Sequence, residues 1–545
     1  MAETAVAQPV RAGSAAGAAP RSQAWLVALL PVVYVGVSLF GFWWIDVSPS
    51  SLVAGWEDTR NLLGRMTPPT FGSPATVARL VLETLLIAVA GTSLAALASV
   101  PLGAVCAATW TGNRVVQGAA RLVVVITRAI PSLVFAIIFV RLFGIGPMAG
   151  GLAVTVHSVG MIAKLYADHL EELDRRPQDA VTATGAGRLQ TFVATVFSRS
   201  LPALTGIVLY RLDINIRASA VLGIVGAGGI GVALQTAMGS LDYRRAAGIV
   251  LVIIGLILLL EVISVTVRRR LSVHRHSGTT AHLLPAGRVP HAVGWDGPRR
   301  RRLALGLAVV ALFAVSLWSL DADLARVRES IPAVGRLLTG MVPPALSGAV
   351  FLGVLESLLM AISATTVGVV AGLVLAVLST DLLVRSRAFN GAVRLVVVLM
   401  RGVPDLVFAL LFVAALGLGP FPGFLALAIS CTALAAKFFT DALESLDPLP
   451  REALEATGAS RVQVFVSAVW PQFVPSFLGN GLFTSDLALR ESTVLGIVGA
   501  GGIGFLLHES VGTLRYETTS AILVLLVVVV LGIESAARWV RRKVF

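Results

Sequence analysis

The chain has 545 residues, of which 56% are hydrophobic and 13% charged, and its mean hydropathy is +0.86. This balance is typical of a membrane protein and not of a soluble globular one. The formal charge is +13, but the arginines gather in short clusters beside apolar stretches, so we expect no nucleic-acid partner. Cys106 and Cys431 exclude a disulfide framework and a cysteine metal cluster, and we expect both to be buried.

Apolar segments of roughly 20 residues or more recur along the chain and predict about twelve transmembrane helices. Residues 1–22 form an Ala/Gly-rich tail that we expect to be disordered. The first span ends at Trp43 and Trp44, which suits an interfacial anchor, and we predict a retained helix and not a signal peptide. The predicted spans are 24–45, 76–108, 118–143, 148–172, 190–220, 246–267, 303–320, 347–380, 391–416, 421–445, 463–493 and 518–540.

Clusters of positive charge orient these spans. Nine arginines lie between Arg268 and Arg302, and the chain finishes with Arg541, Arg542 and Lys543. The positive-inside rule places both stretches in the cytoplasm. Six spans in each half return the chain to the side where it began, so we expect both termini to be cytoplasmic and residues 271–300 to form a cytoplasmic linker.

A constant shift relates the two halves. Arg490 minus Arg217, Arg401 minus Arg128 and Lys437 minus Lys164 each give 273. The same shift superimposes "VLGIVGAGGIG" of the first half on the identical phrase of the second. The sequence therefore predicts an all-α integral membrane protein built from two tandem, parallel six-helix repeats, 23–270 and 301–545, with a path along the pseudo-two-fold axis between them.

One polar stretch interrupts each apolar half, at 174–202 and 447–475. Each begins at a proline and then reaches Thr-Gly-Ala, which predicts a short helix ended by glycine. Such a helix between two spans lies on the membrane surface, here the cytoplasmic one. An ordinary solvated loop is the alternative interpretation.

These stretches resemble the EAA loop of ABC importer permeases. The second copy matches through Glu452, Ala453 and Gly458, whereas in the first copy Asp179 replaces the glutamate and is followed by Ala180 and Gly185. The resemblance implies that residues 177–189 and 450–462 dock into grooves of two ABC ATPase subunits and couple their closure to the transmembrane helices.

The glycine phrase, together with "RAIPSLVFA" and "RGVPDLVFA", resembles the phosphonate permeases of the PhnE family. The resemblance covers roughly 76–270 and 349–543 and implies a type I ABC importer-like permease made of two fused units. It further implies a bacterial cytoplasmic membrane location, an extracytoplasmic phosphonate- or phosphate-binding protein as partner, and ATP and Mg on the partner ATPases. We expect no cofactor, metal site or catalytic residue in this chain, which has no nucleotide-binding Gly-x4-Gly-Lys-Ser/Thr motif.

Arginines inside apolar spans are the main candidates for a substrate pathway. An arginine at mid-membrane costs about 2.5–3.5 kcal/mol, so Arg217 and Arg490 should face protein, water or an anion. Their guanidinium groups suit an oxyanion, but Asp213 and Asp486, one turn earlier, also allow a purely structural ion pair. We include Ser219 and Ser492, which follow the arginines, in this pathway. Arg128 and Arg401 lie three residues before Pro131 and Pro404, where we expect proline to break or kink the helix. The two arginines either line the inner mouth or snorkel to the interface.

The glycines of the repeated phrase complete the predicted pathway. They permit bends and close backbone approach, and they free N–H groups to face an anion; tight helix packing is the alternative. The glycines concerned are Gly226, Gly228, Gly229, Gly499, Gly501 and Gly502. Of the remaining polar residues in the spans, Lys164–Asp168 and Lys437–Asp441 are expected to be interfacial ion pairs and His157 to serve packing.

Two classes of function fit these patterns. The first is the permease of an ATP-driven importer for phosphonate, phosphate or phosphite, or for another solute. The second is a secondary carrier, but carriers usually have inverted repeats and unpaired acidic residues at mid-membrane. The parallel repeat and the two EAA-like stretches favour the importer.

Overall fold

The computed structural model describes residues 24–108, 111, 113–276, 297–321, 324–384 and 386–544, and every regular element in these ranges is helical. The predicted tail 1–22 and residues 277–296 of the predicted linker lie outside the described residues. The helices of the first half are α1 (Ala24–Trp44), α2 (Pro49–Arg65), α3 (Pro74–Cys106), α4 (Arg114–Ala129), α5 (Ser132–Phe143), α6 (Pro147–Glu171), α7 (Arg176–Ala183), α8 (Arg188–Thr191), α9 (Ser198–Leu222), α10 (Ile230–Gly239) and α11 (Tyr243–His276).

The second half repeats this order of elements. Its helices are α12 (Gly297–Ser319), α13 (Leu324–Gly340), α14 (Gly348–Ser379), α15 (Arg387–Gly402), α16 (Asp405–Leu416), α17 (Pro420–Glu444), α18 (Leu449–Ala456), α19 (Arg461–Val464), α20 (Trp470–Gly496), α21 (Gly502–Gly512) and α22 (Tyr516–Val544). A π-helical turn precedes α9 and α20, at Phe192–Phe197 and Phe465–Val469. The predicted duplication is therefore visible element by element.

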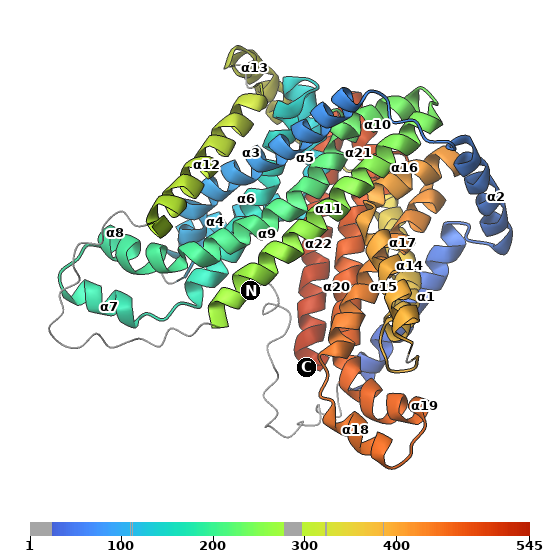
Figure 1. The fold of residues 1–545 in the computed structure, drawn as a ribbon. Helices are drawn as coiled ribbons and strands as arrows, with labels where there is room; N and C mark the ends of the chain where they lie inside the picture. The colour runs from blue at the N-terminus through green and yellow to red at the C-terminus, as the bar shows by residue number, and fades with distance from the viewer. Residues whose placement is uncertain are drawn as a thin grey trace.

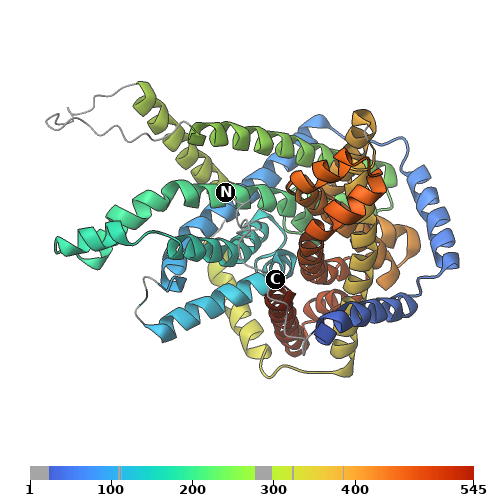
Figure 2. The same cartoon turned by 90° about the horizontal axis from the view of Figure 1, so that it is seen from below.

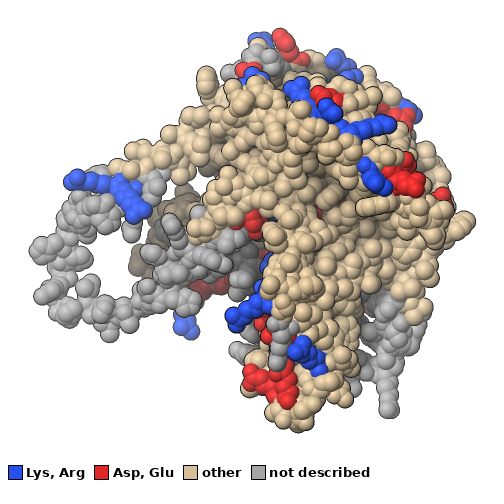
Figure 3. Space-filling view, turned by 45° about the vertical axis from the view of Figure 1, so that its right-hand side comes forward, with Lys and Arg blue, Asp and Glu red and all other residues tan. Residues whose placement is uncertain are grey.

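Several of the helices are long and apolar enough to cross a membrane. In the described residues, 8 helices meet this condition, or up to 11 if each of three bent pairs is one span. The remaining predicted span, 303–320, corresponds to α12, whose apolar described part is the shorter Gly306–Ser319. Figure 3 shows a broad uncharged surface between charged ends, as a bilayer requires.

Two of the bent pairs break at a proline, as the sequence predicts. The α4–α5 break has an angle of 90° and the α15–α16 break one of 79°. Pro131 and Pro404 occupy the N-cap of α5 and α16. Proline cannot donate a backbone hydrogen bond and restricts the preceding residue, so the helix stops there and a new one starts in another direction.

The first helix of each half packs against the other half. α1 packs against α14, and α12 packs against α3 (Figure 1). Between α1 and α14, the Ser363 hydroxyl donates to the Ser38 carbonyl oxygen at 3.3 Å. The sequence boundaries predicted for the repeats stay a prediction, but the packing of the helices crosses them.

The largest buried apolar cluster draws on both halves. It joins residues of α5 and α16, just after the two helix breaks, with isoleucines of both glycine phrases. These residues are Leu133, Val134, Ile137, Leu406, Val407, Ile224, Ile230, Ile497 and Ile503. We call this cluster the apolar seal, because it fills the space between the halves with apolar side chains that cannot solvate an ion.

The two ends of the molecule differ in shape. In Figure 1 the halves converge where α10, α16 and α21 lie and diverge toward the end that carries α7 and α18. Seen from that end in Figure 2, the two short helices are far apart. The structure is thus closed by the apolar seal on one side and splayed on the other.

Candidate functional site: short polar helices and cross-half arginine clusters

The two predicted polar helices are present as α7 and α18. Each begins with a proline in its first turn and stops before a glycine with positive φ, Gly185 (φ 84°) or Gly458 (φ 80°). Asp179 and Ala180 on α7, and Glu452 and Ala453 on α18, are exposed, as are both glycines. The helix ends at a residue in the left-handed conformation, and glycine adopts that conformation at no steric cost because it has no Cβ.

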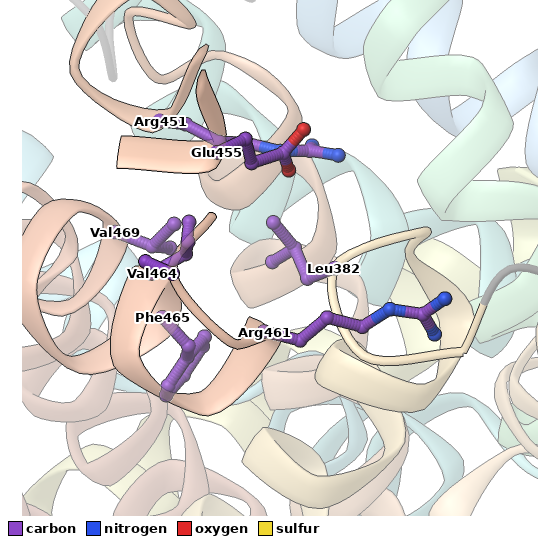
Figure 4. A pocket seen from close by; sticks show the side chains of 8 residues that line it. Leu382, Arg451, Glu455, Arg461, Val464, Phe465 and Val469 are labelled. Carbon is purple, nitrogen blue, oxygen red and sulfur yellow. The ribbon is translucent and has the colours of Figure 1, made fainter. Parts of the chain in front are cut away.

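α18 is held against the α14–α15 loop by charge. Arg451 forms ion pairs with Asp381 at 3.4 Å and with Glu455 at 3.0 Å, and hydrogen bonding to Glu455 raises the pKa of Arg451. Beside them lies a cavity of about 290 Å³, walled by Leu382, Phe465 and their neighbours (Figure 4). Arg461 donates to the carbonyl oxygen of Leu383 at 2.7 Å across the same loop.

Four partly buried arginines form two clusters, and each cluster combines both halves. In the Arg217 cluster, Arg217 of α9 donates to Asp213 at 3.1 Å and to Glu261 of α11 at 2.6 Å. Arg401, from α15 of the other half, interacts electrostatically with Glu261, Arg217 and Asp213. The cluster thus lies where α15 packs against α11.

The Arg490 cluster occupies the equivalent place. Arg490 of α20 donates to Asp486 at 2.8 Å. Arg128, from α4 of the first half, lines a small cavity together with Arg490 and Glu534 of α22. The structure therefore brings the four predicted arginines together in cross-half pairs, in which Arg128 and Arg401 are partly buried.

The other predicted pathway residues lie elsewhere. Ser219 and Ser492 are 1% and 0% exposed, and the Ser492 hydroxyl donates to the Leu489 carbonyl oxygen at 2.7 Å. His157, expected to serve packing, lies with its Nδ1 at 3.0 Å from the carbonyl oxygen of Ile130, at the α4–α5 break, and interacts electrostatically with Arg490. Lys164–Asp168 and Lys437–Asp441 form the predicted ion pairs, and Cys106 and Cys431 are buried and free.

The glycine phrases form tight turns against neighbouring helices. In the first turn, the Gly229 N–H donates to Glu83 at 2.9 Å and the Ile230 N–H to Thr84 at 2.9 Å. The second turn repeats this, with the Ile503 N–H donating to Ser357 at 2.9 Å. The Gly229 N–H, expected to face an anion, is thus already bonded in this conformation.

The remaining glycines of the turns are equally constrained. Gly226, Gly228, Gly499, Gly501 and Gly502 all have positive φ. A Cβ on Gly228 would lie 2.9 Å from the Cα of Pro147, and one on Gly502 would lie 2.4 Å from the Ser357 hydroxyl. Both features that the sequence suggested, bending and close packing, are therefore present.

Sequence reasoning missed the carboxylates that face these features. Glu261 and Glu534, and likewise Glu83 and Glu356, are related by the same shift of 273 that relates the arginines. Glu356 accepts a hydrogen bond from the Gly502 backbone, as Glu83 does from Gly229. A search for acidic residues in apolar spans that keep this shift would have found both pairs.

Among the described residues, no group of three or more His, Cys, Asp or Glu side chains could hold a metal ion. The polar contacts described above are made by arginine, carboxylate, hydroxyl and backbone amide groups.

Comparison with known proteins places this geometry in a wider group. A family model described as "Binding-protein-dependent transport system inner membrane component" matches residues 99–273 and again 368–545. The chain is 39% identical over 508 residues to the phosphate-import permease protein PhnE of Mycolicibacterium smegmatis, covering 92% of each chain. It is 33% identical over 238 residues to the phosphite transport system permease protein PtxC of Stutzerimonas stutzeri, covering 44% of this chain and 86% of that one.

A solved structure titled as inward-facing conformations of the MetNI methionine ABC transporter is also similar. It has 25% sequence identity and a TM-score of 0.33, and the match covers 36% of this chain and 99% of that chain.

Proposed function

We propose a transport function for this chain from one premise: it belongs to the family of binding-protein-dependent transport system inner membrane components. It is the transmembrane permease subunit of an ATP-driven importer, and its cargo is a phosphorus oxyanion such as phosphate, phosphonate or phosphite. Relatives named for phosphate and phosphite transport support this cargo.

One observation carries the proposal: the cross-half arginine clusters. Arg128 and Arg401 immediately precede the helix breaks, whereas the apolar seal begins immediately after them. A guanidinium group inside a membrane protein suits an oxyanion that has left water, because charge-assisted hydrogen bonds replace its hydration. The pathway then runs between the halves, with the seal closed and the arginines on the side of α7 and α18.

The polar helices α7 and α18 indicate where partner subunits would dock. α7 and α18 are exposed at the splayed end, and each would dock one ABC ATPase subunit, so that nucleotide-driven closure of the ATPases draws the halves together. That end and both termini would face the cytoplasm of a bacterium, and an extracytoplasmic binding protein would deliver cargo at the sealed end. ATP and Mg would bind the ATPases, because this chain carries no nucleotide-binding motif of its own.

The test is ATP hydrolysis in liposomes that contain this chain with its co-purifying ATPase and binding protein. Phosphate, phosphite and a phosphonate are added singly, with methionine as the unrelated solute. We expect one phosphorus oxyanion to stimulate hydrolysis and to accumulate inside. If no ATPase co-purifies and uptake follows an imposed ion gradient, the chain is a secondary carrier; stimulation by methionine alone would refute the cargo.

A further inference from the structure

The two arginine clusters, although related by the repeat, differ in how their charges are paired. Arg217 is held by two carboxylates, Asp213 and Glu261. Arg490 pairs with Asp486 alone among the residues that the structure describes. Glu534 is the counterpart of Glu261 and lines the cavity beside Arg490, yet it forms no ion pair with Arg490 within the described part of the chain.

Unpaired atoms gather in the Arg490 cluster. Nε of Arg490, Nε of Arg128 and Oδ1 of Asp486 are buried without a hydrogen-bond partner. Nε of Arg217 is also unpaired, but Nη2 of the same guanidinium group donates to two carboxylates. A buried unsatisfied group costs about 1–3 kcal/mol, and unpaired guanidinium donors on two residues that line one cavity favour an incoming acceptor.

Glu261 accepts a hydrogen bond from Arg217 in the way that a bound oxyanion would. Its oxygen accepts from Arg217 at 2.6 Å, the contact that a phosphorus oxyanion would make with a guanidinium group. A tethered carboxylate competes with a free anion because its effective concentration is high. The cavity between Arg128, Arg490 and Glu534 has a volume of about 10 Å³, roughly one water molecule, so entry of an oxyanion requires α4 and α22 to separate.

We propose that Arg490 and Arg128 form the oxyanion-binding station that opens between the halves, and that Glu261 is an internal competitor that keeps Arg217 closed to cargo. This inference rests on the proposed function and names the part of the pathway that binds cargo. The groups facing the station are Asp486 on its own helix, Glu534 on α22 and His157 on α6. The two halves are then unequal in binding, although they are equal in fold.

Arginine footprinting in the full complex tests the inference. The complex, reconstituted with ATPase and binding protein, is treated with phenylglyoxal during turnover, with and without inorganic phosphate, and modification is quantified for each arginine. Because hydrogen bonds to charged groups contribute about 1.5–3 kcal/mol, we expect phosphate to protect Arg490 and Arg128 about tenfold and Arg217 less than about twofold.

Glu261→Gln and its matched control, Glu534→Gln, test whether Glu261 keeps phosphate away from Arg217. We expect Glu261→Gln to give Arg217 about tenfold protection by phosphate and Glu534→Gln to leave Arg217 unprotected. Co-purification of the ATPase and an unchanged size-exclusion profile verify folding; if Glu261→Gln fails to fold, Glu261→Ser is used in its place.

The outcomes separate this inference from the function on which it rests. Equal protection of Arg217 and Arg490 in the unmodified chain, or equal effects of the two Gln variants, would overturn the asymmetry. Absence of protection at Arg490 in a complex that imports phosphate would overturn the station alone. A complex in which no phosphorus oxyanion stimulates hydrolysis would overturn the proposed function instead.

Discussion

The polar helices of the two halves have the same length and the same glycine terminus, but their attachment to the molecule differs. α18 is tied to the α14–α15 loop by the ion pairs of Arg451. In the first half Gln178 stands where Arg451 would be, and Ala108 and Thr182 replace its two carboxylate partners. α19 also begins with a capping box at Ser460, where the first half has Gly187.

The two arginine clusters differ in the same way as the polar helices: their backbone geometry is shared and their charged contacts are not. The residues that shape the backbone are retained across the shift of 273: the prolines at the helix breaks and the glycines of the turns. The residues that set local charge differ in identity, as with Ala218 and Glu491, or in pairing, as with Glu261 and Glu534. The duplication has therefore kept two equal frameworks and given them unequal charge arrangements.

The largest expected effect comes from Arg490→Gln compared with Arg217→Gln. Arg490→Gln should lower phosphate uptake about 100-fold, because it removes charge-assisted hydrogen bonds to the cargo. Arg217→Gln should act mainly on folding: it removes the ion-pair partner of Asp213 and Glu261, leaves Arg401 as the remaining cation of the cluster, and should cost about 2 kcal/mol of stability. Uptake per folded complex and thermal unfolding are measured on both variants. Loss of uptake in Arg217→Gln with loss of stability in Arg490→Gln would instead assign cargo binding to the Arg217 cluster.

The glycine turns should respond alike in the two halves. Gly502→Ala places a Cβ at 2.4 Å from the Ser357 hydroxyl at a φ of 70°, and Gly229→Ala places one at 2.5 Å from that of Thr84 at 74°. Left-handed strain and a lost hydrogen bond together should cost about 2–3 kcal/mol for each. Gly479→Ala, in the middle of α20 with nothing within 4 Å, is the control and should be neutral or slightly stabilising. A large difference between Gly229→Ala and Gly502→Ala would show that the turns are not equivalent.

Coupling should depend on the end of each polar helix. Gly458→Trp meets open space, since nothing lies within 4 Å of its Cβ, but its φ of 80° strains any side chain by about 1–2 kcal/mol. The bulky ring also occupies the exposed face proposed to dock an ATPase. We expect phosphate transported per ATP hydrolysed to fall about tenfold, with stability lowered only by this backbone strain of about 1–2 kcal/mol. Gly185→Trp is the matched variant; normal coupling in both would argue against docking at α7 and α18.

Much of the fold could be predicted because its signals are local or periodic. Apolar length predicted the spans, Pro131 and Pro404 predicted the breaks, and Gly185 and Gly458 predicted where the polar helices end. The exchange of α1 and α12 between the halves was not predicted. Apolar helices carry no signal that distinguishes packing on their own repeat from packing on the other, because both bury the same kind of surface.

The candidate site was predictable only in part. Arg128, Arg217, Arg401 and Arg490 stood out because charge is costly in an apolar span. Their cross-half pairing depends on tertiary contacts that no spacing reveals. Glu83 binds the Gly229 amide from a distance of 146 residues along the chain, so its partner could not be identified from spacing.

The smallest effect should follow Arg451→Gln, which gives α18 the residue of α7. Asp381 is 67% exposed and Glu455 37%, so solvent screens both ion pairs and their loss should cost less than about 1 kcal/mol. Amide hydrogen exchange in α18 should therefore rise by no more than about fivefold, toward the rate in α7, while global stability stays unchanged. The converse triple change, Ala108→Asp with Gln178→Arg and Thr182→Glu, should slow exchange in α7. If α7 and α18 already exchange at the same rate in the unmodified chain, the ion pairs do not set the difference between the halves, and the asymmetry lies in the arginine clusters alone.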